Sequence, residues 1–190
     1  MSLFLGHIHY LMFDKIKFQE QLINKLLHFT SQREELENEL DALGAIEEGS
    51  LEEIIDPSNI HGWLQERVIR SERRLALVCQ QLITEGQSEK ILQTGYQVGE
   101  ELDFSGNAAE AYTIMTQHFL DGMPCDGALR PLVLEDDEVV LQVITDLHRQ
   151  YWKESTISLY WELRSQFMKG LLKNTKYQWI EKDHPIYEIR

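Results

Sequence analysis

Apolar side chains recur at alternating steps of four and three between residues 22 and 43. The positions in this series are Leu22, Leu26, Phe29, Arg33, Leu36, Leu40 and Leu43. This spacing is typical of a helix that packs lengthwise against another helix. We therefore expect one long helix that starts at Ile8 or Phe13 and ends at Leu43, because Gly44 is a suitable residue to follow a helix.

A second stretch with the same spacing starts after Ser58 or Asn59 and runs to about Thr84. Its apolar series has one polar member, and the positions are Leu64, Val68, Ser71, Leu75, Val78 and Leu82. The connection between the two stretches is short and acidic, and Ser50 with Glu53 forms a capping box for a turn of helix within it. The pattern predicts a long antiparallel helical hairpin over residues 8–84.

The next part of the chain, residues 87–173, also reads as helical. A weaker helix is expected over 87–103, where Gly95 and Gly99 either let a neighbouring backbone approach closely or mark an irregular stretch. Asn107 with Glu110 forms a capping box for the helix that follows.

The C-terminal residues complete the prediction of an all-α protein. Acidic residues at 135–138 are expected to stabilise the N-terminus of a helix over 139–152. Another helix is expected from Ser155 or Thr156 to about Lys173, and the apolar tail 174–190 is expected to dock on the body. Because strand signals are few, the sequence predicts a helical bundle of five to six helices in a single domain, 1–190.

Charge and length restrict the partners and the setting. The chain has 190 residues, with 18 Lys and Arg against 32 Asp and Glu, which gives a net charge of −14. This charge repels phosphate backbones and anionic membrane surfaces, so we expect neither nucleic acid nor membrane as a partner. The longest apolar run is too short to span a membrane, and the N-terminus lacks the features of a secretory signal. Two distant cysteines, Cys79 and Cys125, favour a reducing, cytoplasmic setting.

Sequence patterns for metal or nucleophilic chemistry are weak. Asp146 and His148 are two residues apart and cannot share one face of a helix. The only cysteine expected to be reachable is Cys125, whose acidic neighbours raise the pKa of a thiol. The sequence has no nucleophile elbow and no glycine-rich phosphate-binding motif. We therefore predict no catalytic residue, no metal and no cofactor, although distant residues can still converge in three dimensions.

Aromatic side chains gather in the C-terminal half and are either core residues or the lining of a pocket for an apolar ligand. The residues predicted to bind such a ligand are Tyr112, Met115, His118, Tyr151, Tyr160 and Trp161.

Three hypotheses for function follow. The first is a non-enzymatic regulatory or adaptor protein that acts through helix-mediated binding to a protein partner or to itself as a homodimer. Acidic residues between Glu34 and Asp56 would attract basic surfaces, and the predicted interface residues are Leu22, Leu26, Phe29, Arg33, Leu36 and Leu40. The alternative is a small-molecule-sensing helical domain with an aromatic-lined pocket in the C-terminal half. The third is an enzyme whose acids and histidines meet only in the folded chain.

Overall fold

The structure, a computed structural model, describes residues 4–121, 126–183 and 185–190. Contacts divide these residues into two units. The first unit contains residues 4–87 and 117–120, and the second contains residues 88–116, 121, 126–183 and 185–190. The division at Gln87 falls close to the expected end of the N-terminal helical part.

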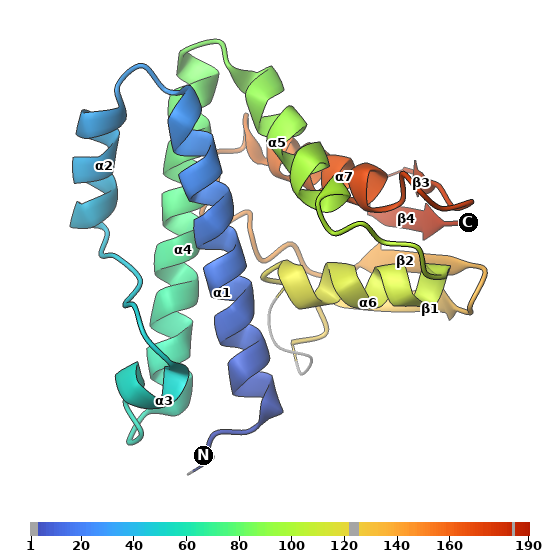
Figure 1. Ribbon diagram of the computed structural model, residues 1–190, viewed down its shortest axis with the longest axis horizontal. Helices are drawn as coiled ribbons and strands as arrows, with labels where there is room; N and C mark the ends of the chain where they lie inside the picture. The colour runs from blue at the N-terminus through green and yellow to red at the C-terminus, as the bar shows by residue number, and fades with distance from the viewer. Residues whose placement is uncertain (1–3, 122–125, 184) are drawn as a thin grey trace. The chain divides into compact units, whose positions relative to one another are not determined.

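Two long helices of the first unit, α1 (His7–Leu26) and α4 (Ile60–Thr84), lie side by side and run in the same direction (Figure 1). Contacts follow in the same order along both helices. Phe13 packs against Trp63, and one helical turn or more further on Gln19 donates to Glu72 at 3.1 Å. The predicted antiparallel pairing of the two long helices is therefore wrong.

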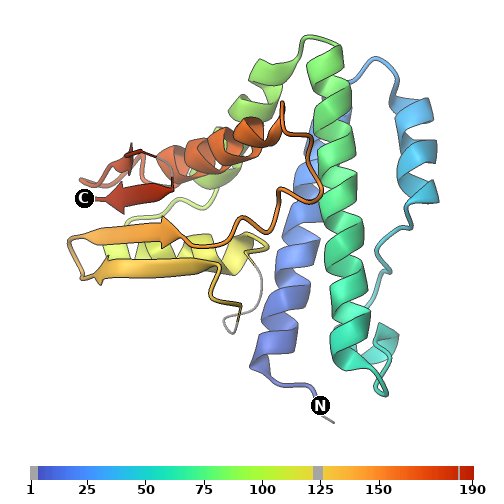
Figure 2. The ribbon, with the colours of Figure 1, turned by 180° about the vertical axis from the view of Figure 1, so that it is seen from behind.

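The helix α2 (Arg33–Ala42) explains how the parallel helices α1 and α4 are connected. It runs back along α4, and the small helix α3 (Leu51–Ile54) precedes the start of α4 (Figure 2). Gln81 near the end of α4 donates to Gln32 at 2.9 Å, whereas Arg74 donates to the carbonyl oxygen of Leu40 at 2.7 Å. The later residue of α2 thus contacts the earlier residue of α4, so α2 lies antiparallel to α4.

The expected continuous helix from Ile8 to Leu43 is broken after the short 3-10 helix η1 (Leu27–Phe29). Glu85, just after α4, accepts from the Thr30 hydroxyl at 2.8 Å and from the Ser31 backbone N–H at 3.1 Å. Hydrogen bonds from Gln81 and Thr30 lower the pKa of Glu85, so this carboxylate holds the break while ionised. The apolar spacing continues across the break because α1 and α2 both bury their apolar faces.

The second unit contains a four-stranded antiparallel sheet, so the prediction of an all-α protein is wrong. Its strands, in the spatial order β1-β2-β4-β3, are β1 (Leu129–Leu134), β2 (Val139–Val143), β3 (Trp179–Glu181) and β4 (Ile186–Ile189). The residues predicted to form a helix over 139–152 instead form β2 and a series of turns. In β2, Val139, Leu141 and Val143 are buried, and the residues between them are only partly buried. This twofold alternation and the β-branched side chains favour a strand.

Acidic residues 135–138 connect β1 to β2 rather than cap a helix. The N–H of Glu135 donates to the carbonyl oxygen of Glu138 at 2.9 Å, which closes the hairpin. The C-terminal tail supplies β3 and β4, and β4 pairs with β2 in the middle of the sheet. Its apolar residues are thus held by strand pairing.

Three glycines bring two helices of the second unit unusually close. The helices α5 (Ser88–Glu100) and α7 (Ile157–Leu171) cross where Gly95, Gly99 and Gly170 lie. A Cβ atom on Gly99 would stand 2.0 Å from the carbonyl oxygen of Phe167, and one on Gly170 would stand 2.0 Å from that of Tyr96. Close approach of backbones, one of the two readings of Gly95 and Gly99, is therefore confirmed.

The helix α6 (Ala108–His118) lies along β1 and β2 in both ribbon views (Figure 1, Figure 2). The predicted capping box is present, because the N–H of Asn107 donates to Glu110 and the N–H of Glu110 donates to the Asn107 side chain, both at 2.9 Å. Ala108, Ala111 and Met115 are buried. No helix in the described part of the chain combines the length and the apolar character needed to span a membrane.

Candidate functional site

Three ionisable side chains meet inside the second unit, and we name them the Asp121 cluster: Asp121, His148 and Arg164. The guanidinium Nη1 of Arg164 donates to Oδ1 of Asp121. The imidazole Nε2 of His148 lies 3.4 Å from the same oxygen. Because an ionised carboxylate can only accept, a hydrogen bond here requires the hydrogen on Nε2. All three side chains are buried, with exposed fractions of 9%, 2% and 3% in the order named.

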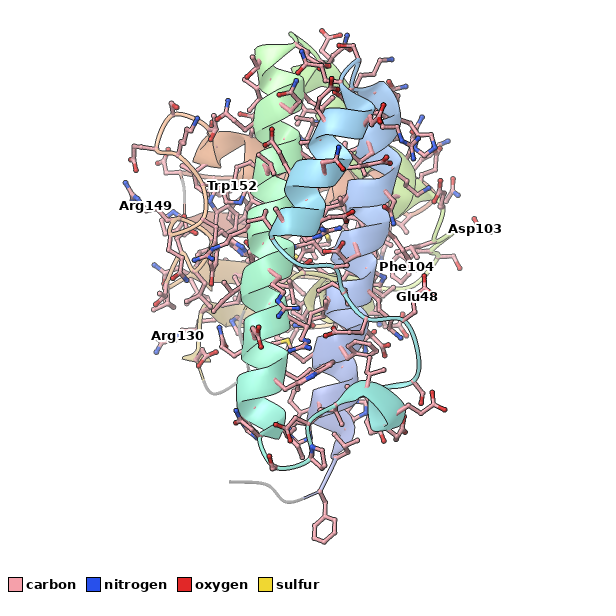
Figure 3. All side chains as sticks on the ribbon, turned by 90° about the vertical axis from the view of Figure 1, so that its left-hand side faces the viewer. Glu48, Asp103, Phe104, Arg130, Arg149 and Trp152 are labelled. Carbon is pink, nitrogen blue, oxygen red and sulfur yellow. The ribbon has the colours of Figure 1, made fainter. Side chains whose placement is uncertain are left out.

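The turn that follows β2 places His148 in the cluster. Oδ1 of Asp146 accepts from the backbone N–H groups of His148 at 3.0 Å and of Arg149 at 3.1 Å, which is the local bonding expected of aspartate in a turn. Its other oxygen accepts from the indole N–H of Trp161 at 3.3 Å. Asp146 therefore ties the turn to α7, the helix that carries Arg164. The side chain of Arg149 points away from the unit (Figure 3) and pairs with Glu154.

Aromatic rings surround the imidazole of the cluster. The rings of His148 and Tyr160 lie face to face at a tilt, with centroids 3.9 Å apart. Trp161 meets His148 edge on at 5.7 Å and stacks on Tyr187 of β4 at 6.3 Å. Nη2 of Arg164 donates to the Met115 sulfur at 3.5 Å. Residues from α6, the turn after β2, α7 and β4 thus form one enclosure around the cluster.

Charges in the cluster stabilise one another. Burial by itself raises the pKa of Asp121, but the charge of Arg164 and the hydrogen bond from His148 outweigh burial and hold this pKa well below its usual range. Burial and the charge of Asp121 raise the pKa of Tyr112. Burial also raises the pKa of Tyr187 to about 12. At neutral pH the site therefore holds a carboxylate and a guanidinium among neutral phenols.

Among the buried polar atoms of this region, two that bear on a ligand have no hydrogen-bond partner among the described residues. They are Oδ2 of Asp121, which can accept, and Nε1 of Trp152, which can donate. The Trp152 ring lies 5.6 Å from Tyr160, so both atoms belong to the same set of contacts. Buried polar groups of folded proteins are almost always paired, and exceptions call for an explanation.

Four of the six predicted ligand-binding residues lie around the Asp121 cluster: Tyr112, Met115, Tyr160 and Trp161. Tyr151 lies in the same turn as His148 and donates its N–H to the His148 carbonyl oxygen at 2.8 Å. Tyr112, Tyr151 and Trp161 are half-buried. His118 lies elsewhere, in the first unit, where its ring contacts Phe18 at 4.6 Å.

Sequence reasoning did not select the three ionisable members of the cluster. The acid near His148 in the sequence is Asp146, whereas its partner in the cluster, Asp121, lies 27 positions away. Arg164 offered a signal, because it lies one turn after Tyr160 and one turn before Met168 on an apolar stripe of α7. A charged residue on such a stripe requires a buried partner. Cys125, the other chemical candidate, lies outside the described residues.

Most of the predicted interface residues are used inside the first unit. Leu22, Leu26, Leu36 and Leu40 are each at most 4% exposed within a single chain. Phe29 is half-buried, and Arg33 is exposed and pairs with Glu37 on its own helix at 2.8 Å. The apolar spacing is therefore explained by packing of α1 and α2 within one chain, and a homodimer stays a prediction without that support.

Within the described ranges, no group of three or more His, Cys, Asp or Glu residues is arranged to hold a metal ion. Comparisons with models of protein families, with curated proteins and with solved structures found no match to this chain.

Proposed function

We propose that this chain is a non-enzymatic small-molecule-binding protein and that its second unit holds the ligand at the Asp121 cluster. The observation that carries the proposal is the burial of a carboxylate, an imidazole and a guanidinium together within aromatic rings. A reducing, cytoplasmic setting is part of the proposal and agrees with Cys79, a buried free cysteine.

Stability alone is a poor explanation for the cluster. Moving a carboxylate and a guanidinium out of water costs several kcal/mol each, and their mutual attraction commonly does no more than offset that loss. Apolar side chains of similar volume often stabilise a fold as well or better. A binding role therefore gives a better reason for ionisable groups at this position.

The unpartnered atoms indicate the chemistry of the ligand. Oδ2 of Asp121 requires a donor such as an amine or amide N–H, and the indole N–H of Trp152 requires an acceptor. The rings of Tyr160 and Trp161 offer apolar faces to the body of a ligand. We propose an aromatic amine or aromatic amide as the ligand class.

The proposal is tested by thermal unfolding of the full chain in the presence of a library of aromatic amines and amides. A compound that binds only the folded chain stabilises it by mass action, by about 2.7 kcal/mol at one hundred times its Kd. The Kd of each stabilising compound is then measured by calorimetry.

Two tryptophan variants provide a matched comparison. Trp152→Phe removes the unpartnered indole N–H, whereas Trp179→Phe removes an N–H that already donates to Ser165 at 3.1 Å. We expect Trp152→Phe to weaken binding by about 1 kcal/mol, the usual value of one hydrogen bond, and Trp179→Phe to leave the Kd unchanged. The absence of any stabilising compound, or an equal loss in both variants, contradicts the proposal.

A second candidate function is binding of a basic protein partner by α2, the adaptor hypothesis. Acidic residues at 34, 35, 39 and 41 are exposed on this helix, and its last turn has no basic residue. Glu39 and Asp41 lie at the C-terminus of the helix, where negative charge is unfavourable, and a cationic partner would relieve it. Two arginines at this helix are engaged, since Arg33 pairs with Glu37, and Arg74, which donates to the Leu40 carbonyl oxygen, pairs with Glu20.

This candidate is tested with fluorescent oligolysine at several salt concentrations. Neutralising the four exposed acids of α2 (34, 35, 39 and 41) to Gln or Asn should weaken binding more than neutralising the four acids at 135–138, a change that removes the same charge from another surface. Equal effects of the two sets would indicate attraction by net charge alone and would reject α2 as the site.

A further inference from the structure

Two imidazole rings of the first unit meet where α1 and α4 begin. His9 lies in the first turn of α1 and is 3% exposed, and His61 is the second residue of α4. Their Nε2 atoms are 3.3 Å apart, and the rings meet edge to face with centroids 5.1 Å apart. A contact between two titratable groups of the same kind therefore ties the N-terminal ends of these helices.

A backbone hydrogen bond decides which nitrogen of His9 carries the hydrogen. The N–H of Gly6, the residue before α1, donates to Nδ1 of His9 at 2.9 Å. Since one nitrogen of a neutral imidazole accepts and the other donates, His9 donates through Nε2 and His61 accepts through Nε2. The relay from Gly6 to His61 thus requires the Nε2–H tautomer of His9 and the Nδ1–H tautomer of His61.

Both rings must be neutral for the relay to persist. A proton added to His9 binds Nδ1, which then no longer accepts from the N–H of Gly6. A proton added to His61 binds Nε2, which then no longer accepts from Nε2 of His9. Either cation also stands at the N-terminus of a helix, where the helix dipole opposes positive charge. Uptake of one proton therefore breaks a hydrogen bond in the relay and adds an unfavourable charge.

Among the described residues, the acids on neighbouring turns that the contacts identify are already paired. The charged and titratable groups on neighbouring turns pair with one another: Tyr10 with Glu52, Lys17 with Asp14, and Arg67 with Glu47 and Glu66. Burial first, and then the charge of His61, lower the pKa of His9. These effects favour the neutral form of His9 that the relay requires.

We propose that His9 and His61 form a proton-operated latch that holds the first turn of α1 against the start of α4 at neutral pH and releases it in acid. The same geometry opposes a metal ion shared by the two rings, because chelation needs a lone pair on both Nε2 atoms. In the relay, Nε2 of His9 carries a hydrogen.

The tautomers provide the first test of the latch. Long-range nitrogen–proton correlation spectra of the full chain at pH 7.5 distinguish Nε2–H from Nδ1–H histidine. The expected result is Nε2–H for His9 and Nδ1–H for His61. The same tautomer on both rings overturns the proposal.

Hydrogen exchange of the full chain between pH 7.5 and 5 measures the release. After correction for intrinsic exchange rates, the hydrogen-bonded amides at the starts of α1 and α4, those of His9 and Trp63, should lose protection by up to about tenfold per pH unit, the limit for uptake of one proton. Exchange that keeps a constant protection factor over this range in the natural chain overturns the proposal.

Two glutamine variants separate the latch from general titration of histidine. His61→Gln supplies an acceptor that does not titrate, so the pH dependence should be reduced to the part that comes from protonation of His9. His28→Gln removes an exposed histidine of the same unit, whose Nδ1 lies 2.8 Å from the carbonyl oxygen of Asn24, and should retain it. Retention of the full pH dependence in His61→Gln rejects the latch.

Discussion

Asp121 and Arg164 are 43 positions apart in the sequence and form a buried ion pair inside the second unit. Asp121 directly follows residues that belong to the first unit, and Arg164 lies on α7. His148, from the turn after β2, contacts the same carboxylate oxygen. One carboxylate thus holds two cationic or potentially cationic side chains from separate segments.

Replacement of Asp121 by Asn is expected to lower the free energy of unfolding by about 3–5 kcal/mol, because the variant leaves the guanidinium of Arg164 buried without a counter-charge. Urea unfolding measures the change. Asp137→Asn is the control, since that carboxylate is exposed and pairs with Lys176 on the surface, and it should change stability little. An equal change in unfolding free energy for the two substitutions would show that the buried ion pair contributes no more to stability than the surface pair.

Acid should destabilise the protein partly through Asp121. Because the pKa of this carboxyl is lower in the folded chain than in the unfolded chain, the unfolded chain takes up the proton first. The stabilisation is complete above the ordinary aspartate pKa of about 4 and decreases as the pH falls below it. Unfolding free energies measured from pH 6 to pH 2.5 should fall more steeply for the natural chain than for Asp121→Asn. Parallel curves would contradict this prediction.

Glycine substitutions test the close crossing of α5 and α7. Gly99→Ala and Gly170→Ala should each destabilise the protein by about 1–3 kcal/mol or more, because their Cβ atoms would overlap backbone atoms of the facing helix. Gly95→Ala should be milder, since its nearest atom is 2.7 Å away. Gly86→Asn, which extends into open space with a residue that tolerates positive φ, is the control for thermal unfolding. A larger destabilisation by Gly95→Ala than by Gly99→Ala and Gly170→Ala would contradict the position of the crossing between α5 and α7.

Leu40→Ala tests whether the apolar spacing serves packing within one chain. Leu40 is 1% exposed, so its truncation should lower the unfolding free energy by about 2–5 kcal/mol. Leu132→Ala, at a leucine that is 49% exposed, should have a much smaller effect. Urea unfolding at several protein concentrations checks the packing argument, because loss of an intermolecular contact would make the result depend on concentration.

Local patterns in the sequence were sufficient for several helices. The apolar stripe and the end signals placed α4 and α7 within a few residues, and the capping box at Asn107 marked the start of α6. These features depend on bonds and contacts between residues at most a few turns apart.

Other features depend on pairs that a local pattern does not contain. The apolar spacing from Leu22 to Leu43 fits one continuous helix and fits equally two helices that pack on the same neighbour. The hydrogen bonds from Thr30 and Ser31 to Glu85 locate the break, and they are visible only in the folded chain. A short run such as Val139–Val143 suits a buried helix or a strand, and pairing with β4 decides for the strand.

The sequence by itself determined where most helices form, the acidic charge and the gathering of aromatic side chains. Only the tertiary structure decided that α1 and α4 run parallel, that the last residues complete a sheet, and that Asp121, His148 and Arg164 share one buried site. The physical reason is range: helix propensity and capping act between residues three or four apart, whereas strand pairing and charge burial join residues whose separation in the chain carries no local signal.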